Sequence, residues 1–319
     1  MMKPIHGIEV DQRIWPLIFH PDGSGVWGGT HSHGIDGEKR EEIYFLSPFP
    51  HLRERVLFAP ARTFNIDSHG NLLLACDSSG NSQLYDIKSK EVLWQIEGLR
   101  AGKLSPDGKL FVGFQRGKAT ICDVFQRIQS KEISFFGYTA VSGIWHPLND
   151  ILSIHFVGDS TSNLRFYTKG SGWQANEMWN IDGLTREASN ITFSPCGNFL
   201  VFTDELLHLF SFSPVTHIAS FNGEGERILD VEKKKYKKVE PFSLYNKYWS
   251  PIVFSYDSKT MFCGSPKGHI LSFDFKSNNF IDKIHAHLGA ILSMTLSIDG
   301  RFVVSSGEDR SINIWQTDY

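Results

Sequence analysis

Short apolar runs alternate with turn residues along the chain, and the pattern is clearest between positions 287 and 315. Apolar runs at 290–296 and 302–305 flank the sequence Ser-Ile-Asp-Gly at 297–300, and a third run ends at Trp315. Short runs of residues that favour extended backbone, separated by turn residues, are typical of antiparallel strands. The pattern therefore predicts an all-β protein built from meanders.

A turn of the Ser-Pro-Asp-Gly kind recurs along the chain. Pro fixes φ at the second position and Asp-Gly favours tight-turn geometry, so each copy has a local physical cause. An apolar run follows each copy and predicts the second strand of a repeating unit. The seven copies, which predict seven units, occupy positions 20–23, 67–70, 105–108, 146–149, 194–197, 255–258 and 297–300.

Each unit is predicted to contain two more strands. The third strand tends to end in an aromatic residue followed by Asp, with related endings at 84–86, 121–123, 272–274 and 314–316. A fourth, outer strand is predicted at 92–96, 129–134, 217–221 and 280–285. Too few residues follow Trp315 for a fourth strand, whereas residues 5–10 alternate and belong to no unit. We expect residues 5–10 to complete the last unit and close the ring, because closure removes exposed sheet edges.

These units resemble the WD-repeat family, whose repeat corresponds to one four-stranded propeller blade of about 40–45 residues. The resemblance implies a single seven-bladed β-propeller over residues 1–319, with four-stranded antiparallel blades. It also implies a hydrogen-bonded structural tetrad in blade seven, made of His287, Ser305, Asp309 and Trp315. Ser, His and Asp are also the components of a hydrolase triad, but the resemblance assigns them to bonding within the blade. The other blades lack the full set and are expected to depend on apolar packing.

Composition narrows the class of protein. The formal net charge of −3 is too small to favour wholesale binding of nucleic acid or membranes. The four cysteines are far apart, so neither a disulfide framework nor a zinc site is expected, and a reducing compartment is favoured. Residues 1–10 lack the apolar core of a secretory signal, and no run is long enough for a membrane span. We expect an intracellular protein, nuclear or cytoplasmic.

Two insertions interrupt the repeat pattern, at 30–42 in blade one and at 222–247 between blades five and six. The first holds His31 and His33, which are possible metal ligands, but a Gly-rich loop of this kind is more typical of solvated chain. No metal or cofactor is therefore expected. The second has a basic run that fits a short nuclear-import pattern, a binding element for an acidic partner, or a solvated loop. Its basic residues are Lys233, Lys234, Lys235, Lys237 and Lys238.

Residues 113–118, Gly-Phe-Gln-Arg-Gly-Lys, resemble a phosphate-binding loop only superficially. Three residues rather than four separate the glycines, and neither Ser nor Thr follows Lys118, so we interpret the segment as a turn between strands. It also lacks one arginine of the Phe-Arg-Arg-Gly motif of phosphoinositide-binding propellers. The chain contains neither a Gly-x-Ser-x-Gly nor a His-Glu-x-x-His motif. No enzyme is predicted.

Candidate partner-binding residues follow from the register of the first strands. In the WD-repeat family, residues just before and within these strands rim the face on which partners usually bind. Arg and aromatic residues dominate binding hot spots, and four of them in three consecutive blades predict a basic-aromatic patch for an acidic or phosphorylated segment. Ordinary surface arginines are the alternative. The candidates are Arg13, Trp15, Arg62 and Arg100, with Glu187 and Tyr248 in later blades.

The resemblance implies a function as a non-catalytic scaffold or adaptor, because fold alone does not specify chemistry and loops on a rigid scaffold suit binding. We expect a monomeric propeller that binds other protein subunits inside a larger complex. The alternative is a substrate receptor of a cullin-type ubiquitin ligase. Residues 85–88 and 273–276 resemble the Trp-Asp-x-Arg box of that family, but both lack the Trp and the Arg.

Overall fold

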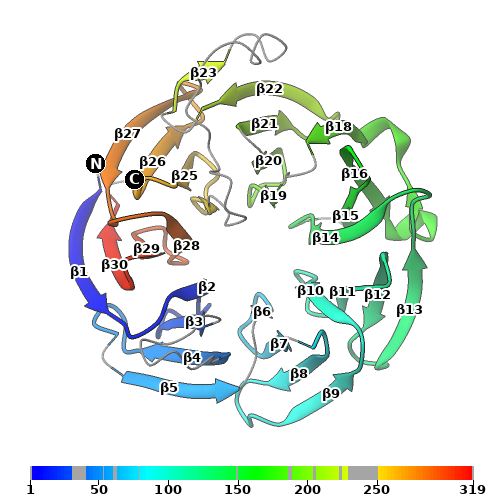
Figure 1. Ribbon diagram of the computed structural model, residues 1–319, viewed down its shortest axis with the longest axis horizontal. Coiled ribbons are helices and arrows are strands. Elements are labelled where there is room, and N and C mark those ends of the chain that lie inside the picture. The colour runs from blue at the N-terminus through cyan, green and yellow to red at the C-terminus, as the bar shows by residue number, and fades with distance from the viewer. Residues whose placement is uncertain are drawn as a thin grey trace.

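Within the described residues, seven antiparallel sheets surround a central axis, so the protein is a seven-bladed β-propeller (Figure 1). The all-β, seven-bladed prediction is confirmed. The computed structural model describes residues 2–30, 41–52, 54–59, 63–77, 79–148, 150–185, 189–203, 206–222, 225–228 and 251–317.

In blades one, two, three, five and six, the strands pair in chain order from the centre outward (Figure 1). Blade one contains β2 (Ile14–Phe19), β3 (Val26–Thr30), β4 (Glu42–Ser47) and β5 (Glu54–Ala59), and blade two contains β6 (Thr63–Ile66), β7 (Leu72–Cys76), β8 (Ser82–Asp86) and β9 (Val92–Ile96). Blade three contains β10 (Arg100–Leu104), β11 (Leu110–Gln115), β12 (Lys118–Asp123) and β13 (Ile128–Ile133). Blade six contains β24 (Ile252–Phe254), β25 (Thr260–Gly264), β26 (His269–Asp274) and β27 (Asn279–His285).

Blades four and five depart from the four-strand pattern that the sequence predicts. Blade four contains β14 (Thr139–Trp145), β15 (Ile151–Val157) and β16 (Thr161–Thr168), and its outer strand is split into β17 (Gln174–Ala175) and β18 (Ile181–Thr185). The short 3-10 helices η1 (Lys169–Ser171) and η2 (Glu177–Trp179) accompany this split. Blade five contains β19 (Ser189–Phe193), β20 (Phe199–Thr203), β21 (Leu207–Ser211), β22 (Thr216–Phe221) and an additional outer strand, β23 (Arg227–Ile228).

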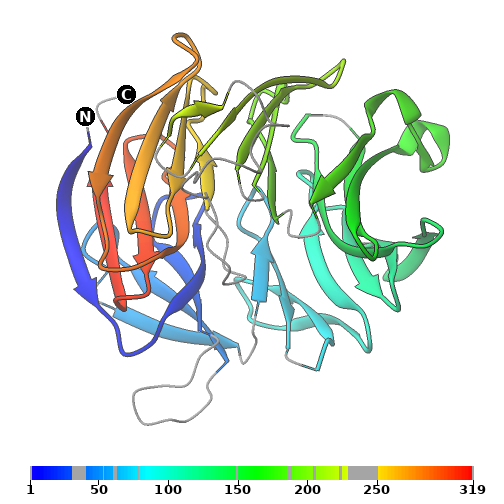
Figure 2. The same cartoon turned by 45° about the horizontal axis from the view of Figure 1, so that its top comes forward.

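Blade seven is completed by the N-terminal strand, as predicted. It contains β28 (Ile291–Leu296), β29 (Phe302–Gly307) and β30 (Ser311–Gln316), and β1 (Lys3–Glu9) pairs with the outer side of β30. The register runs from Lys3 opposite Gln316 to Glu9 opposite Ser311. Figure 2 shows β1 alongside β30, with the two ends of the chain close together. The ring is therefore held closed by strand pairing between sequence-distant segments.

The hydrophobic core lies between the blades. Side chains alternate across a strand, so each blade buries both of its faces against neighbours. In β11, Phe111 joins the cluster between blades two and three, whereas Val112 joins the cluster between blades three and four. Burial of both faces explains why the middle strands are continuous apolar runs rather than alternating ones.

The recurrent turns have a shared hydrogen-bond pattern. In blade three, Ser105 Oγ donates to Asp107 Oδ1 at 2.7 Å and accepts from the Leu110 N–H at 2.9 Å. Blades six and seven repeat this arrangement at 255–260 and 297–302. A side-chain hydroxyl thus closes the turn that the sequence pattern predicts.

Side chains from neighbouring blades satisfy backbone groups on the innermost strands. Ser293 Oγ of blade seven accepts from the Leu17 N–H of blade one at 2.9 Å, and Asn65 Oδ1 of blade two accepts from the Leu104 N–H of blade three at 2.9 Å. These donors lie on strands with one partner strand only, so they would otherwise lack a protein acceptor. The contacts join consecutive blades at the centre of the ring.

Candidate interaction face

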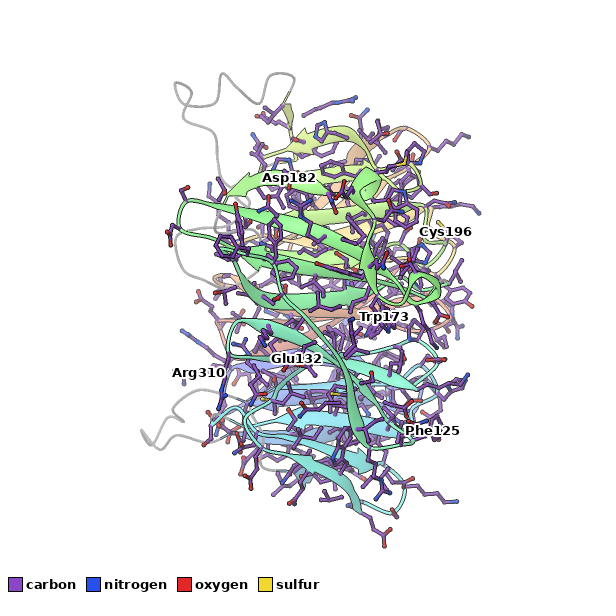
Figure 3. All side chains as sticks on the ribbon, turned by 90° about the vertical axis from the view of Figure 1, so that its right-hand side faces the viewer. Phe125, Glu132, Trp173, Asp182, Cys196 and Arg310 are labelled. Carbon is purple, nitrogen blue, oxygen red and sulfur yellow. The ribbon has the colours of Figure 1, made fainter. Side chains whose placement is uncertain are left out.

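The strand order divides the propeller into two faces. Because neighbouring strands are antiparallel, the first-to-second turns, and the third-to-fourth turns where the chain makes them, lie at one end, which we call the turn face. The second-to-third turns and the connections between blades lie at the other end, which we call the connection face. Figure 3 shows Arg310 on the connection face and Phe125, Trp173 and Cys196 on the turn face.

The predicted tetrad residues of blade seven are joined by hydrogen bonds. His287 lies just before β28, and its Nε2 is 2.8 Å from Ser305 Oγ. Trp315 Nε1 donates to the same Ser305 Oγ at 3.0 Å. On the other side of the imidazole ring, Nδ1 is 3.0 Å from Asp309 Oδ1. The four side chains therefore connect β29, β30 and the turn between them to the segment that enters the blade.

Two further side chains extend this network beyond the predicted set. Ser311 Oγ donates to Asp309 Oδ1 at 2.8 Å and lies 2.9 Å from His287 Nδ1. Asn313 Nδ2 donates to the Ala286 carbonyl at 2.8 Å. Both residues lie on β30, where alternate side chains share one face of the strand. The polar residues at 309, 311 and 313 alternate in the sequence, and this spacing could have predicted that Ser311 and Asn313 join the network.

Burial and hydrogen bonding both act on the pKa values of the tetrad. Desolvation lowers the pKa of His287, although Asp309 acts in the opposite direction. Burial acts to raise the pKa of Asp309, but hydrogen bonds from the Leu288 N–H and from His287 outweigh it and lower that pKa. Ser305 has no exposed surface. Its hydroxyl is therefore covered, and the geometry suits a structural role better than a nucleophilic one.

The predicted partner-binding residues in the described part of the chain lie on or next to the connection face. Arg13 precedes β2 and is exposed, with Nη1 at 4.0 Å from Glu308 Oε1. Trp15 lies on β2 and is half-buried. Arg100 begins β10 and is exposed. Blade two separates the residues of blade one from Arg100, so the predicted continuous patch depends on residues of that blade.

The remaining predicted residues lie outside the part of the chain that the structure describes. This applies to Arg62, the blade-two member of the predicted patch, and to the possible metal ligands of the first insertion. It applies equally to Glu187, Tyr248, Lys233, Lys234, Lys235, Lys237 and Lys238.

Sequence reasoning missed three exposed residues on the connection face. Arg116 lies in the turn between β11 and β12, the segment that the sequence had indicated as a turn between strands. Phe136 lies in the connection from blade three to blade four and is 100% exposed, and Val141 lies on β14. Gly137 was the available signal, since a glycine between two predicted strands indicates a turn.

Two properties of the described residues limit the kinds of site that they contain. Among them, no group of three or more His, Cys, Asp or Glu side chains is arranged to hold a metal ion. No helix in the described ranges is both long enough and apolar enough to cross a membrane.

Comparison with known proteins identifies one repeat. Residues 278–316 match the family model described as WD domain, G-beta repeat. The match begins at the outer strand of blade six, β27, and ends with β30 of blade seven. One sequence repeat therefore spans the boundary between two structural blades.

Two known proteins share limited regions of similarity with the chain. WD repeat-containing protein 3 from Homo sapiens is 40% identical over 52 residues, which cover 16% of this chain and 6% of the human protein. UBP9-binding protein bun62 from Schizosaccharomyces pombe is 26% identical over 91 residues, which cover 28% of this chain and 17% of the yeast protein. The matched regions thus span less than a fifth of either relative. The chain is therefore a seven-bladed β-propeller whose last blade contains a match to the WD repeat.

Proposed function

We propose that this protein is a non-catalytic scaffold that binds other protein subunits through its connection face. The observation that carries the proposal is the exposure of Arg13 and Arg100 on this face, next to inner strands held together by bonds between blades. Arginine is a preferred anchor in protein interfaces because its planar group forms several directed hydrogen bonds. A rigid scaffold lowers the entropic cost of presenting such groups.

The buried tetrad also supports a binding function over a catalytic one. Ser305, which would be the nucleophile of a hydrolase triad, is fully buried and bonded to Trp315. An activated serine must instead contact its substrate. WD-repeat propellers generally act as protein-interaction scaffolds, which agrees with this arrangement.

The name of one relative points in the same direction. The fission yeast protein is by name a binding protein of UBP9. For this chain, we propose protein partners in a hetero-complex inside the cell, in the nucleus or the cytoplasm. The predicted preference for acidic or phosphorylated segments follows from the positive charge of Arg13 and Arg100.

Affinity purification with mass spectrometry from native cells tests the proposal. We expect the full chain to co-purify with a stable set of subunits, and the double variant Arg13→Glu/Arg100→Glu to lose part of that set. The matched control is Lys88→Glu/Arg127→Glu, which reverses two exposed charges in turns of the turn face. A chain without co-purifying subunits would contradict the scaffold function, whereas a cullin adaptor among the subunits would favour a ligase receptor.

A second variant, lacking residues 222–247, separates the roles of the basic loop. Loss of subunits on deletion would make the loop a recognition element. Retention of all subunits, with loss of nuclear accumulation of a fluorescent fusion, would indicate an import signal. If neither subunit binding nor nuclear accumulation changes, the basic loop has neither role and the solvated-loop interpretation is favoured.

A further inference from the structure

Three aromatic residues in the connection from blade three to blade four differ sharply in their surroundings. The Phe135 ring stacks on Tyr138, with ring centroids 4.8 Å apart, and Arg165 Cζ lies 4.6 Å from the centre of the Phe135 ring. Phe136, between these anchored rings, is 100% exposed. Its side chain therefore buries no surface in the fold.

The turn that carries Phe136 is closed by a backbone hydrogen bond and lies next to a packed ring. The Tyr138 N–H donates to the Phe135 carbonyl at 3.0 Å, and Gly137 has a φ of 79°, which a residue with a side chain rarely adopts. Arg165, which packs on Phe135, is fixed in turn by Asp182, with Nη2 2.7 Å from Oδ1. The exposed ring is thus presented from a fixed backbone, which lowers the entropic cost of binding.

A turn of blade three lies against this segment. The Ala140 N–H donates to the Gly117 carbonyl at 2.9 Å, which joins the start of β14 to the turn between β11 and β12. A Cβ placed on Gly117 would lie 3.5 Å from Thr139 Oγ1, so the two segments are close neighbours. Arg116 is in this turn and is exposed. The turn and Phe136 therefore share one part of the connection face.

Arg100 and Val141 extend the same area. Arg100 is exposed and lies opposite Phe114 in the pairing of β10 with β11. Phe114 precedes Arg116 by two residues. Val141 on β14 is 36% exposed. Among the described residues, neither Arg100 nor Arg116 lies within ion-pair distance of a carboxylate. Their guanidinium groups are therefore available to an external anion.

We propose that Arg100, Arg116, Phe136 and Val141, which we call the blade 3–4 patch, bind an acidic peptide segment of a partner protein that also carries an apolar residue. The proposal rests on the scaffold function and specifies where and what the scaffold binds. Two guanidinium groups without ion-pair partners match carboxylates. The exposed ring of Phe136 matches an apolar side chain.

The turn face of blade three also carries an exposed phenylalanine and an exposed arginine, which can be compared with Phe136 and Arg116. Phe125 is 74% exposed and Arg127 is exposed, and both lie in the turn between β12 and β13. Arg127 also has a left-handed backbone, with a φ of 56° against 49° for Arg116. These two residues come from a single turn, whereas the blade 3–4 patch combines three segments of two blades. The pair therefore provides controls of the same residue types on the opposite face.

Selection from a surface-displayed library of short random peptides against the purified full chain tests this proposal. We expect enriched peptides to combine Asp or Glu with an apolar residue. The affinity for the most enriched peptide, measured by fluorescence anisotropy, should fall roughly tenfold or more in Arg100→Glu/Arg116→Glu and in Phe136→Ser. Arg127→Glu and Phe125→Ser should bind as the unmodified chain does. Added salt should weaken binding, because the exposed charges are screened.

Several results would overturn the proposal. These are the absence of enriched peptides, enrichment of peptides without acidic residues, and equal losses in the patch and control variants. Binding to phosphatidylserine vesicles that is lost in Phe136→Ser, without any peptide binding, would assign the patch to a membrane surface instead. If patch variants keep every subunit that co-purifies with the unmodified chain, the proposed role of the patch is wrong but the scaffold function is still supported. If the unmodified chain captures no subunits, the scaffold itself is wrong.

Discussion

Replacement of Ser305 by alanine tests the energetic role of the tetrad most directly. The Ser305 hydroxyl joins two buried groups, His287 Nε2 at 2.8 Å and Trp315 Nε1 at 3.0 Å. Ser305 itself is 0% exposed, His287 2% and Trp315 7%. Ser305→Ala removes the hydroxyl and leaves the backbone and Cβ unchanged. The substitution therefore isolates the two hydrogen bonds.

The magnitude follows from the groups that lose their partner. A buried donor or acceptor without a partner costs about 1–3 kcal/mol. Two such groups, Nε2 of His287 and the Trp315 N–H, predict a loss of roughly 2–6 kcal/mol in the free energy of unfolding. Since blade seven also contains the strand that closes the ring, the loss should appear in the main unfolding transition.

The assay is equilibrium unfolding in urea, followed by tryptophan fluorescence and circular dichroism. Ser153→Ala is the matched control, because Ser153 is also a fully buried serine on the second strand of its blade. Its Oγ has no hydrogen-bond partner. Removal of an unpaired buried hydroxyl should be neutral or slightly stabilising. Equal destabilisation by the two substitutions would refute the reasoning, because the hydrogen bonds would then contribute nothing specific.

Three further predictions concern other parts of the fold. Burial lowers the pKa of His155 from 6.5 to about 4, so the unfolded chain takes up a proton before the folded chain does. About 3 kcal/mol of stability should therefore be lost as the pH falls from 6.5 to 4. Thermal unfolding measured across this pH range should show the loss, and His155→Leu should make the stability less dependent on pH. Phe135→Ala should lower the free energy of unfolding by roughly 1–3 kcal/mol, because the contacts of its ring are lost. Phe136→Ala should change the free energy of unfolding by less than about 0.5 kcal/mol. Equal effects of the two substitutions in urea unfolding would contradict the interpretation. Deletion of residues 2–9 should expose the edge of β30. We therefore expect a lower melting temperature and, in light scattering, association that depends on protein concentration. A monomeric protein with an unchanged melting temperature would show that β1 is dispensable for closure of the ring.

The sequence alone determined the features that depend on local chemistry. Turn residues at 105–108 and 297–300 adopt their geometry through hydrogen bonds within a few residues, so their spacing predicted the number of blades. Alternating residues near the N-terminus and the short segment after Trp315 together predicted the closing strand. The spacing of polar residues in blade seven identified the tetrad residues before their contacts were known.

Only the tertiary structure decided which side chains of similar type are buried and which are exposed. Phe135 and Phe136 are adjacent and identical in sequence, yet one packs under Arg165 and the other is fully exposed. The pairing of β10 with β11 places Arg100 opposite Phe114, and Arg116 follows Phe114 by two residues. Exposure and proximity depend on contacts between segments distant along the chain, whereas turn and strand preferences arise within a few residues. That difference in range is the physical reason why the sequence predicted the architecture but not the blade 3–4 patch.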